Sequence, residues 1–145
     1  MMNVPDDVKN WVVLLVDDES DNLGVAEKFL TFAGARVHSA SNGVEGLDVL
    51  ARVHPSVVLL DLSMPQMDGW TMLERIRANP EWDSLIVIAV TAHAMTGDKE
   101  RVMKAGFDGY IDKPLRLATF LGDVRNWIEK TRQRRSPVVQ GNTGQ

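Results

Sequence analysis

Residues 12–19 read VVLLVDDE, in which five apolar residues are followed directly by three acidic ones. Two later stretches follow a similar pattern, VVLLD at residues 57–61 and LIVIAVT at residues 85–91. Short continuous apolar runs rich in valine and isoleucine predict strands that are covered on both faces, as in parallel sheets. Each of these runs ends in a polar residue. The repeated pattern therefore predicts polar side chains where the strands of a parallel sheet end.

Weaker apolar segments at residues 35–40 and 110–111 bring the number of predicted strands to five. Apolar residues with helical spacing lie between and after the strands, and they predict helices over residues 23–33, 44–51, 70–76, 99–105 and 117–128. Ser20 or Asp21 is expected to cap the first helix, and Asn79-Pro80 to stop the third. Strand and helix alternate along the chain, which favours a parallel α/β sandwich with right-handed crossovers.

The composition is that of one globular domain. The chain has 145 residues, of which 44% are hydrophobic and 25% charged, and a domain usually has about 100–200 residues. The absence of cysteine excludes disulfides, thiolate zinc sites and cysteine nucleophiles, and it suits a reducing compartment. The longest apolar runs have six residues, whereas a membrane span needs about 18. We therefore expect a cytoplasmic protein without a membrane span or a signal peptide.

The charge is unevenly distributed. The net charge is −4, but residues 129–145 hold four basic residues and one acidic residue. Residues 1–128 hold more acidic than basic residues. This argues against broad binding to a nucleic-acid backbone, which needs a basic face. The basic end could contact nucleic acid or an anionic membrane, although a solvated helix end is the favoured interpretation. We expect residues 1–10 to form an N-terminal extension and residues 131–145 a basic, disordered tail.

Polar side chains suited to chemistry follow four of the predicted strands. Asp17 and Asp18 follow the first strand, Asp61 the third, Thr91 the fourth and Lys113 the fifth. Ligands of open parallel sheets bind outside the carboxyl ends of the strands, where the strand order reverses. If that reversal lies between the first and third strands, the three carboxylates converge. Two carboxylates about 5 Å apart repel by roughly 3 kcal/mol at an effective dielectric constant of about 20, so either a proton or a cation is needed.

The available ligands favour one class of cation and one class of reaction. They are all oxygen atoms, which selects a hard cation, Mg²⁺ first. A metal ion held there could align a phosphoryl group for attack by a carboxylate, while Thr91 donates a hydrogen bond and Lys113 neutralises charge. The product would be an aspartyl phosphate. Each residue alone has an ordinary explanation as a loop, cap or turn residue, and only their joint occurrence supports this hypothesis.

Longer motifs surround these residues. They read VLLVDDE at 13–19, DLSMPQMDG at 61–69, AVTA at 89–92, AGFDGY at 105–110 and KP at 113–114. In the order and spacing of these motifs, residues 11–130 resemble the receiver domain of bacterial two-component response regulators. The resemblance implies a five-stranded parallel sheet of order 2-1-3-4-5 in a flavodoxin-like, three-layer αβα sandwich with five helices.

The resemblance also implies a metal site. Asp61 would be the phospho-acceptor, and the protein ligands of Mg²⁺ would be Asp18, Asp61 and the backbone carbonyl of Ser63. Asp17 would act on the metal through water, and Mn²⁺ is expected to substitute for Mg²⁺. Ser63 and His93 are candidates for tuning the lifetime of the phosphate, although His93 has an equally good interpretation as a plain loop residue.

A phosphate site and a switch follow from the same resemblance. Thr91, Ala92 and Lys113 would contact the phosphoryl group. Thr91 and Tyr110 would form the conformational switch. The Lys113-Pro114 peptide bond would be cis, an isomer that only a bond to proline adopts at small cost.

The predicted function is a phosphorylation-controlled signalling switch, not an enzyme: it would catalyse only its own aspartyl phosphorylation and dephosphorylation. The expected donor is a histidine kinase or a histidine phosphotransfer protein. An unidentified downstream protein would read the face formed by the fourth helix, the fifth strand and the fifth helix. We expect a monomer or weak dimer. After Ile128 only 17 residues remain, too few for a DNA-binding domain.

Several alternatives stay open at this stage. The chain could be a stand-alone receiver, a receiver cut from a hybrid histidine kinase or larger regulator, as the stretch AHAM at 92–95 would fit, or a phosphate sink. A degenerate docking domain is less favoured, because the acidic set is intact. A haloacid-dehalogenase-type phosphatase would need Asp-x-Asp-x-Thr where residues 17–21 read DDESD, and those acids would repel the FMN phosphate of a flavodoxin.

Overall fold

The structure is a computed structural model that describes residues 7–64, 66–92 and 97–135. Its centre is a parallel sheet of order β2-β1-β3-β4-β5. The strands are β1 (Val12–Val16), β2 (Arg36–Ala40), β3 (Val57–Asp61), β4 (Ile86–Thr91) and β5 (Gly109–Asp112). The helices are α1 (Ser20–Phe32), α2 (Gly43–Val53), α3 (Gly69–Arg77), α4 (Asp98–Ala105) and α5 (Leu117–Arg135), with short 3₁₀ turns η1 (Val8–Asn10) and η2 (Pro80–Trp82).

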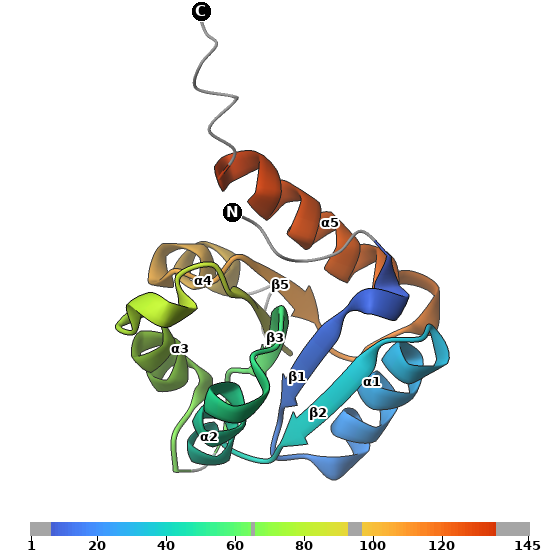
Figure 1. The fold of residues 1–145 in the computed structure, drawn as a ribbon, viewed down its shortest axis with the longest axis horizontal. Helices are drawn as coiled ribbons and strands as arrows, with labels where there is room; N and C mark the ends of the chain where they lie inside the picture. Colours follow the sequence, from blue (N-terminus) through green and yellow to red (C-terminus); the bar gives the residue numbers. More distant parts are fainter. Residues whose placement is uncertain (1–6, 65, 93–96, 136–145) are drawn as a thin grey trace, which may run out of the picture.

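The sheet separates two hydrophobic cores, which confirms the predicted three-layer sandwich (Figure 1). Helices α1 and α5 cover one face and meet there through Phe29 and Phe120, whose rings lie 5.7 Å apart. Helices α2, α3 and α4 cover the other face. Strands β3 and β4 are buried along their whole length, as expected for central strands covered on both faces. None of the described helices combines the length and the apolar character that crossing a bilayer requires.

Two features of the register bring the functional residues to one edge of the sheet. Val16 of β1 pairs with Leu60 of β3, so that the next residues of both strands, Asp17 and Asp61, lie side by side. On the other side, Thr91 of β4 pairs with Asp112 of β5, and Lys113 follows directly. Parallel strands end at the same edge, so the fold itself carries these side chains together.

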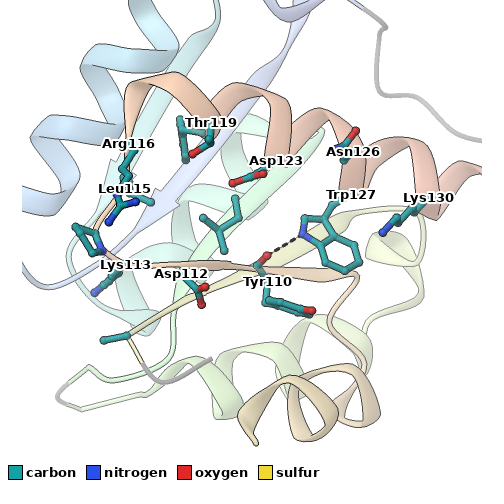
Figure 2. A pocket seen from close by; sticks show the side chains of 14 residues that line it. Tyr110, Asp112, Lys113, Leu115, Arg116, Thr119, Asp123, Asn126, Trp127 and Lys130 are labelled. Atoms are coloured by element: carbon teal, nitrogen blue, oxygen red, sulfur yellow. Dashed lines mark hydrogen bonds between the residues drawn. The ribbon is translucent and has the colours of Figure 1, made fainter. Parts of the chain in front are cut away.

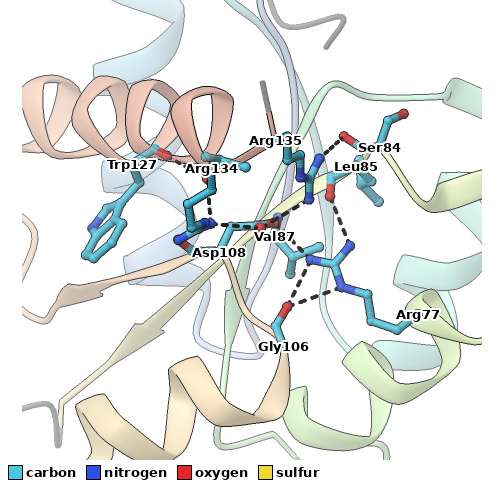
Figure 3. Close-up of polar contacts among 10 residues, drawn as sticks. Arg77, Ser84, Leu85, Val87, Gly106, Asp108, Trp127, Arg134 and Arg135 are labelled. Carbon is cyan, nitrogen blue, oxygen red and sulfur yellow. Dashed lines mark hydrogen bonds and ion pairs between the residues drawn. The ribbon is translucent and has the colours of Figure 1, made fainter. Parts of the chain in front are cut away.

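The C-terminal helix is longer than expected. We predicted a disordered tail from residue 131, but α5 continues to Arg135, and Thr131 is fully buried. Arg134 and Arg135 fold back onto Asp108, with Nη2–Oδ1 distances of 3.3 and 3.1 Å (Figure 3). Tertiary contacts therefore hold the last turn of the helix, which the local composition did not indicate. Residues 136–145 lie outside the described ranges.

Smaller differences concern the other ends. The N-cap of α1 is Glu19, one residue before Ser20 and two before Asp21, which were the predicted alternatives, and its side chain makes no capping hydrogen bond. Helix α4 begins at Asp98, one residue earlier than predicted. Within the predicted N-terminal extension, Val8 is buried in the core shared by α1 and α5. The third helix ends at Arg77, before Asn79, and Asn79 caps the following 3₁₀ turn.

Candidate functional site

Three carboxylates meet at the C-terminal edge of β1 and β3. Oxygen atoms of Asp17, Asp18 and Asp61 all lie within 4.8 Å of one another, and we call these three residues the carboxylate cluster. Asp17 and Asp61 are buried, whereas Asp18 is exposed. The Glu19 amide donates to Asp17 Oδ1 at 2.9 Å and so helps to orient that carboxylate. The predicted convergence of the three residues is therefore present.

Lys113 is the cation that faces this cluster. Its Nζ lies 3.1 Å from Asp61 Oδ1, 3.3 Å from Asp17 Oδ2 and 3.7 Å from Glu19 Oε1. The backbone fixes its place, because the Lys113 amide donates to the Thr91 carbonyl at 2.9 Å. The Lys113-Pro114 peptide bond is cis. One ammonium group thus serves several carboxylates, and the site retains excess negative charge.

The electrostatics reflect this imbalance. Burial raises the pKa of Asp61 to about 6, and the neighbouring charge of Asp17 adds to the effect, while Lys113 and the Ser63 amide oppose it. Burial by itself would lower the pKa of Lys113, but its hydrogen bond and Coulomb attraction to Asp61 and the attraction of Asp17 outweigh that cost, so its pKa is raised. Lys113 therefore stays charged, and bringing a second cation near Asp61 is electrostatically favourable.

An open cavity of about 300 Å³ lies over the cluster. Most of the predicted site residues line it together with one further acid; the full set is Asp18, Glu19, Asp61, Ser63, Thr91, Ala92 and Lys113. Carboxylate oxygens, the ligands that Mg²⁺ prefers, line this cavity. The cavity also leaves room for water and a phosphoryl group. The residues present therefore fit a hard divalent cation, and Lys113 lies beside two carboxylates of the cluster.

Tyr110 lies outside this cavity. It is half-buried on β5 and lines a neighbouring groove of about 530 Å³ between β5 and α5 (Figure 2). The register nevertheless brings it close to Thr91, because Tyr110 pairs with Ala89 and residues two apart lie on the same face of a strand. Tyr110 therefore lies beside Ala89, a small residue that precedes Thr91 by two positions on the same face of β4.

Three contributors were missed by the site assignment from sequence. Glu19 lines the cavity and contacts Lys113, as its position directly after the two aspartates could have indicated. Gly69 lies against the end of β3, where an added Cβ would approach the Asp61 carbonyl oxygen to 2.4 Å. Trp127 contacts Tyr110 from α5, and no motif pointed to it. His93 lies outside the described residues.

The chain matches the response regulator receiver domain family over residues 13–125. It therefore belongs to that family, and its fold is that of a receiver domain. The residues of the family match include all of β1 except its first residue, all of β2 to β5, and the entire carboxylate cluster.

Relatives support this membership. The polar-differentiation response regulator DivK of Brucella ovis is 29% identical over 116 residues, which are 80% of this chain and 94% of that protein. The receiver domain of the sensor histidine kinase PA1611 of Pseudomonas aeruginosa, solved with a magnesium ion in its active-site cleft, is 31% identical with a TM-score of 0.74, over 83% of this chain and 98% of that one. A putative response regulator from Chloroflexus aurantiacus is 28% identical with a TM-score of 0.77, over 82% and 98%.

Proposed function

We propose that this chain is a Mg²⁺-dependent phosphorylation switch in which Asp61 accepts the phosphoryl group. The observation that carries the proposal is the carboxylate cluster beside Lys113 under an open cavity. Three carboxylates and one lysine leave the site short of positive charge, and a metal ion together with a phosphoryl group would complete it. The chain would act as a signalling switch and not as an enzyme that turns over an external substrate.

The transfer step uses residues that face the cavity. A carboxylate oxygen of Asp61 attacks phosphorus, the phosphorus–nitrogen bond of a phosphohistidine donor breaks, and the departing imidazole nitrogen keeps the electron pair. With a pKa of about 6, Asp61 is mainly ionised at neutral pH and can act as the nucleophile. Lys113 would stay charged beside it and neutralise a phosphoryl oxygen, and the hydroxyl of Thr91, which also lines the cavity, would donate to another.

Asp18, Asp61 and the Ser63 carbonyl would hold the Mg²⁺ ion, and Asp17 would act on it through water. When bound, the metal offsets the charge of the phosphoryl oxygens and aligns the group for in-line attack. The receiver of PA1611, with its magnesium-containing cleft, is a related example. Mn²⁺ is expected to substitute, since it accepts the same oxygen ligands. Ser63 also lines the cavity and is proposed to influence the phosphate lifetime.

The signal would leave through the face of α4, β5 and α5. A phosphoryl group on Asp61 would draw Thr91 toward it, and the space over Ala89 would then accept the ring of Tyr110. Such a two-state element supplies the differential contacts that a population shift requires. The downstream partner would bind the state in which Tyr110 has turned inward.

The proposed donor is a histidine kinase or a histidine phosphotransfer protein, and the relatives include both a response regulator of similar length and a receiver from a sensor kinase. The phosphorylation chemistry would be the same in either setting. A cytoplasmic, monomeric or weakly dimeric protein is consistent with this role and stays a prediction.

The direct test is phosphorylation by acetyl phosphate with and without Mg²⁺, followed by intact-mass spectrometry. We expect one phosphoryl group per chain with Mg²⁺ and none with EDTA. Asp61→Asn should abolish the adduct. Asp112→Asn is a matched control, because Asp112 is an exposed carboxylate at the same sheet edge and outside the cluster; it should label like the parent. Labelling of Asp61→Asn at the parent level would overturn the assignment.

A further inference from the structure

Trp127 of α5 lies flat against the edge strand β5. A Cβ added at Gly109 would fall 2.2 Å from Trp127 Cδ2, so only glycine lets the indole ring approach the strand this closely. The indole Nε1–H donates to the Tyr110 carbonyl at 2.7 Å (Figure 2). Close packing on one strand residue and a hydrogen bond to the next therefore fix the ring on β5.

The Trp127 ring also meets the side chain of Tyr110. The two ring centroids are 5.0 Å apart, with a tilt of 53° between the planes, a favourable aromatic arrangement. Tyr110 packs against the core under α2, α3 and α4, whereas Trp127 packs against the core under α1 and α5. The two side chains thus connect the two faces of the sheet around its β5 edge.

A lysine lies over each ring. Lys99 of α4 has its Nζ 5.6 Å from the Tyr110 ring centroid, and Lys130 of α5 has its Nζ 4.8 Å from the Trp127 ring. Both distances fall within the range of cation–π attraction. The four side chains form a continuous row from α4 across β5 to α5, and a movement of Tyr110 would break the row at its centre.

We propose that Trp127 is the positioning residue of Tyr110: it holds the ring in the place it has here and transmits its departure to α5. This inference rests on the proposed phosphorylation switch. If Tyr110 turns inward, Trp127 loses its aromatic neighbour, and the surface between Trp127 and Lys130 changes. Because coupling is reciprocal, removing the Trp127 contact should also make the phosphorylated arrangement easier to reach.

Beryllofluoride stands in for the phosphoryl group. Its affinity shows whether loss of the Trp127 contact favours or disfavours the phosphorylated arrangement. With Mg²⁺ present, Trp127→Leu should bind beryllofluoride about 2- to 10-fold more tightly than the parent, which corresponds to the loss of one aromatic pair. Trp127→Phe keeps a ring beside Tyr110 and should stay closer to the parent. Trp82→Leu is the matched control, since Trp82 is also partly buried but lies in η2; it should leave this affinity unchanged.

A measurement on the parent protein avoids any folding defect of the variants. Tyr110 is the single tyrosine, and Trp127 is one of four tryptophans, so selective labelling follows both rings by NMR. We expect the Tyr110 ring and Trp127 indole signals to shift together when beryllofluoride binds, while the Trp82 signal stays in place. Assignment of the indole signal uses Trp127→Phe.

The outcomes separate this inference from the proposed function. If the parent protein does not bind beryllofluoride with Mg²⁺, both fail. If it binds and Tyr110 shifts, but the Trp127 signal does not move or Trp127→Leu binds with the affinity of the parent, the switch stands and the positioning role of Trp127 is overturned. A common loss of affinity in Trp127→Leu and Trp82→Leu would show a merely structural contribution and would also overturn it.

Discussion

Two buried aspartates lie at opposite ends of the strands of the same sheet, and the net charges of their neighbours have opposite signs. Asp61 lies at the carboxyl ends of the strands and Asp108 at the amino ends. Asp61 is the last residue of β3 and lies beside two more aspartates and one lysine. Asp108 precedes β5 and receives three arginines: Arg77 at 2.8 Å, Arg134 at 3.3 Å and Arg135 at 3.1 Å (Figure 3). Their side chains are almost equally inaccessible, with exposures of 5% and 7%. Burial alone therefore does not distinguish a reactive carboxylate from a structural one.

The partners make the difference. The Asp108 carboxylate also accepts from the Val87 amide at 2.9 Å, and Arg77 further donates to the carbonyls of Gly106 and Leu85. We call Asp108 and its three arginines the arginine cluster, and each of these four side chains has protein partners. Through them, Asp108 connects α3, α5 and the start of β4. The carboxylate cluster has one lysine for three acids, with an open cavity above it. This shortage of positive charge around Asp61 is what the proposed metal ion and phosphoryl chemistry would use.

The largest effect is expected at Asp108. Asp108→Ala removes the carboxylate that three guanidinium groups and the buried Val87 amide share. It should lower the free energy of unfolding by about 3 kcal/mol or more. Urea denaturation measures this loss. Asp48→Ala is the control, because the exposed Asp48–Arg52 pair is worth less than about 1 kcal/mol. An equal, small loss in both variants would contradict the structural role of Asp108.

Asp61→Asn should act in the opposite direction in metal-free buffer. The pKa of Asp61 is about 6 in the folded state and 3.8 in the reference state, so the folded protein binds more protons between these values. Stability of the parent should therefore fall as pH rises from about 4 to about 7, by up to about 3 kcal/mol at 1.36 kcal/mol per pKa unit.

The Asn variant lacks this contribution. It should be more stable than the parent at pH 8 and should lose that advantage near pH 4. Unfolding measurements over this pH range, with Asp112→Asn as the control for the loss of one carboxylate, determine the difference. If the free energy of unfolding of Asp61→Asn depended on pH as that of the parent does, Asp61 would not be the source of the pH dependence.

Mg²⁺ should stabilise the parent by about 1.4 kcal/mol at ten times its Kd, because it binds the folded cluster only. Asp18→Ala should remove most of this gain, since Asp18 is an exposed member of the cluster and its loss costs little packing. Thermal melts with increasing MgCl₂ test both statements. A melting temperature of the parent that does not respond to Mg²⁺ would show that the cluster does not bind the ion.

The smallest effect is expected at Arg135, one of the two α5 arginines that contact Asp108. Arg135→Ala should cost less than about 1 kcal/mol, since its side chain is 30% exposed and two arginines remain on Asp108. Hydrogen exchange should become faster in the last turn of α5 and stay unchanged in β4. The increase in melting temperature with Mg²⁺ should also stay the same as in the parent. A change in it would show coupling between Asp108 and the carboxylate cluster, which the structure does not indicate.

Local patterns in the sequence predicted the strands, the helices and the carboxylates at the strand ends. The strand order and the predicted roles of Ser63 and Ala92 came from the resemblance to receiver domains. Continuous apolar runs indicated buried strands, and the cavity residues Asp18, Asp61 and Thr91 lie at the ends of these runs or within two positions of them. The arginine cluster and the Trp127 contact were not predicted. Arg77 and Asp108 are 31 residues apart and Trp127 is 17 residues from Tyr110, so neither contact has a local signature. The composition of residues 131–135 even suggested disorder where Asp108 holds a helix.

The sequence by itself determined which residues end the strands and, through the length and order of the apolar runs, which edge of the sheet they share. The tertiary structure decided the charge balance around each of them. Residues 17, 61 and 108 are the same amino acid, but their chemistry depends on which side chains other elements bring to them. Only the packing of α3 and α5 against the sheet supplies Asp108 with three cations, while the strand order leaves Asp61 with two neighbouring acids and one lysine.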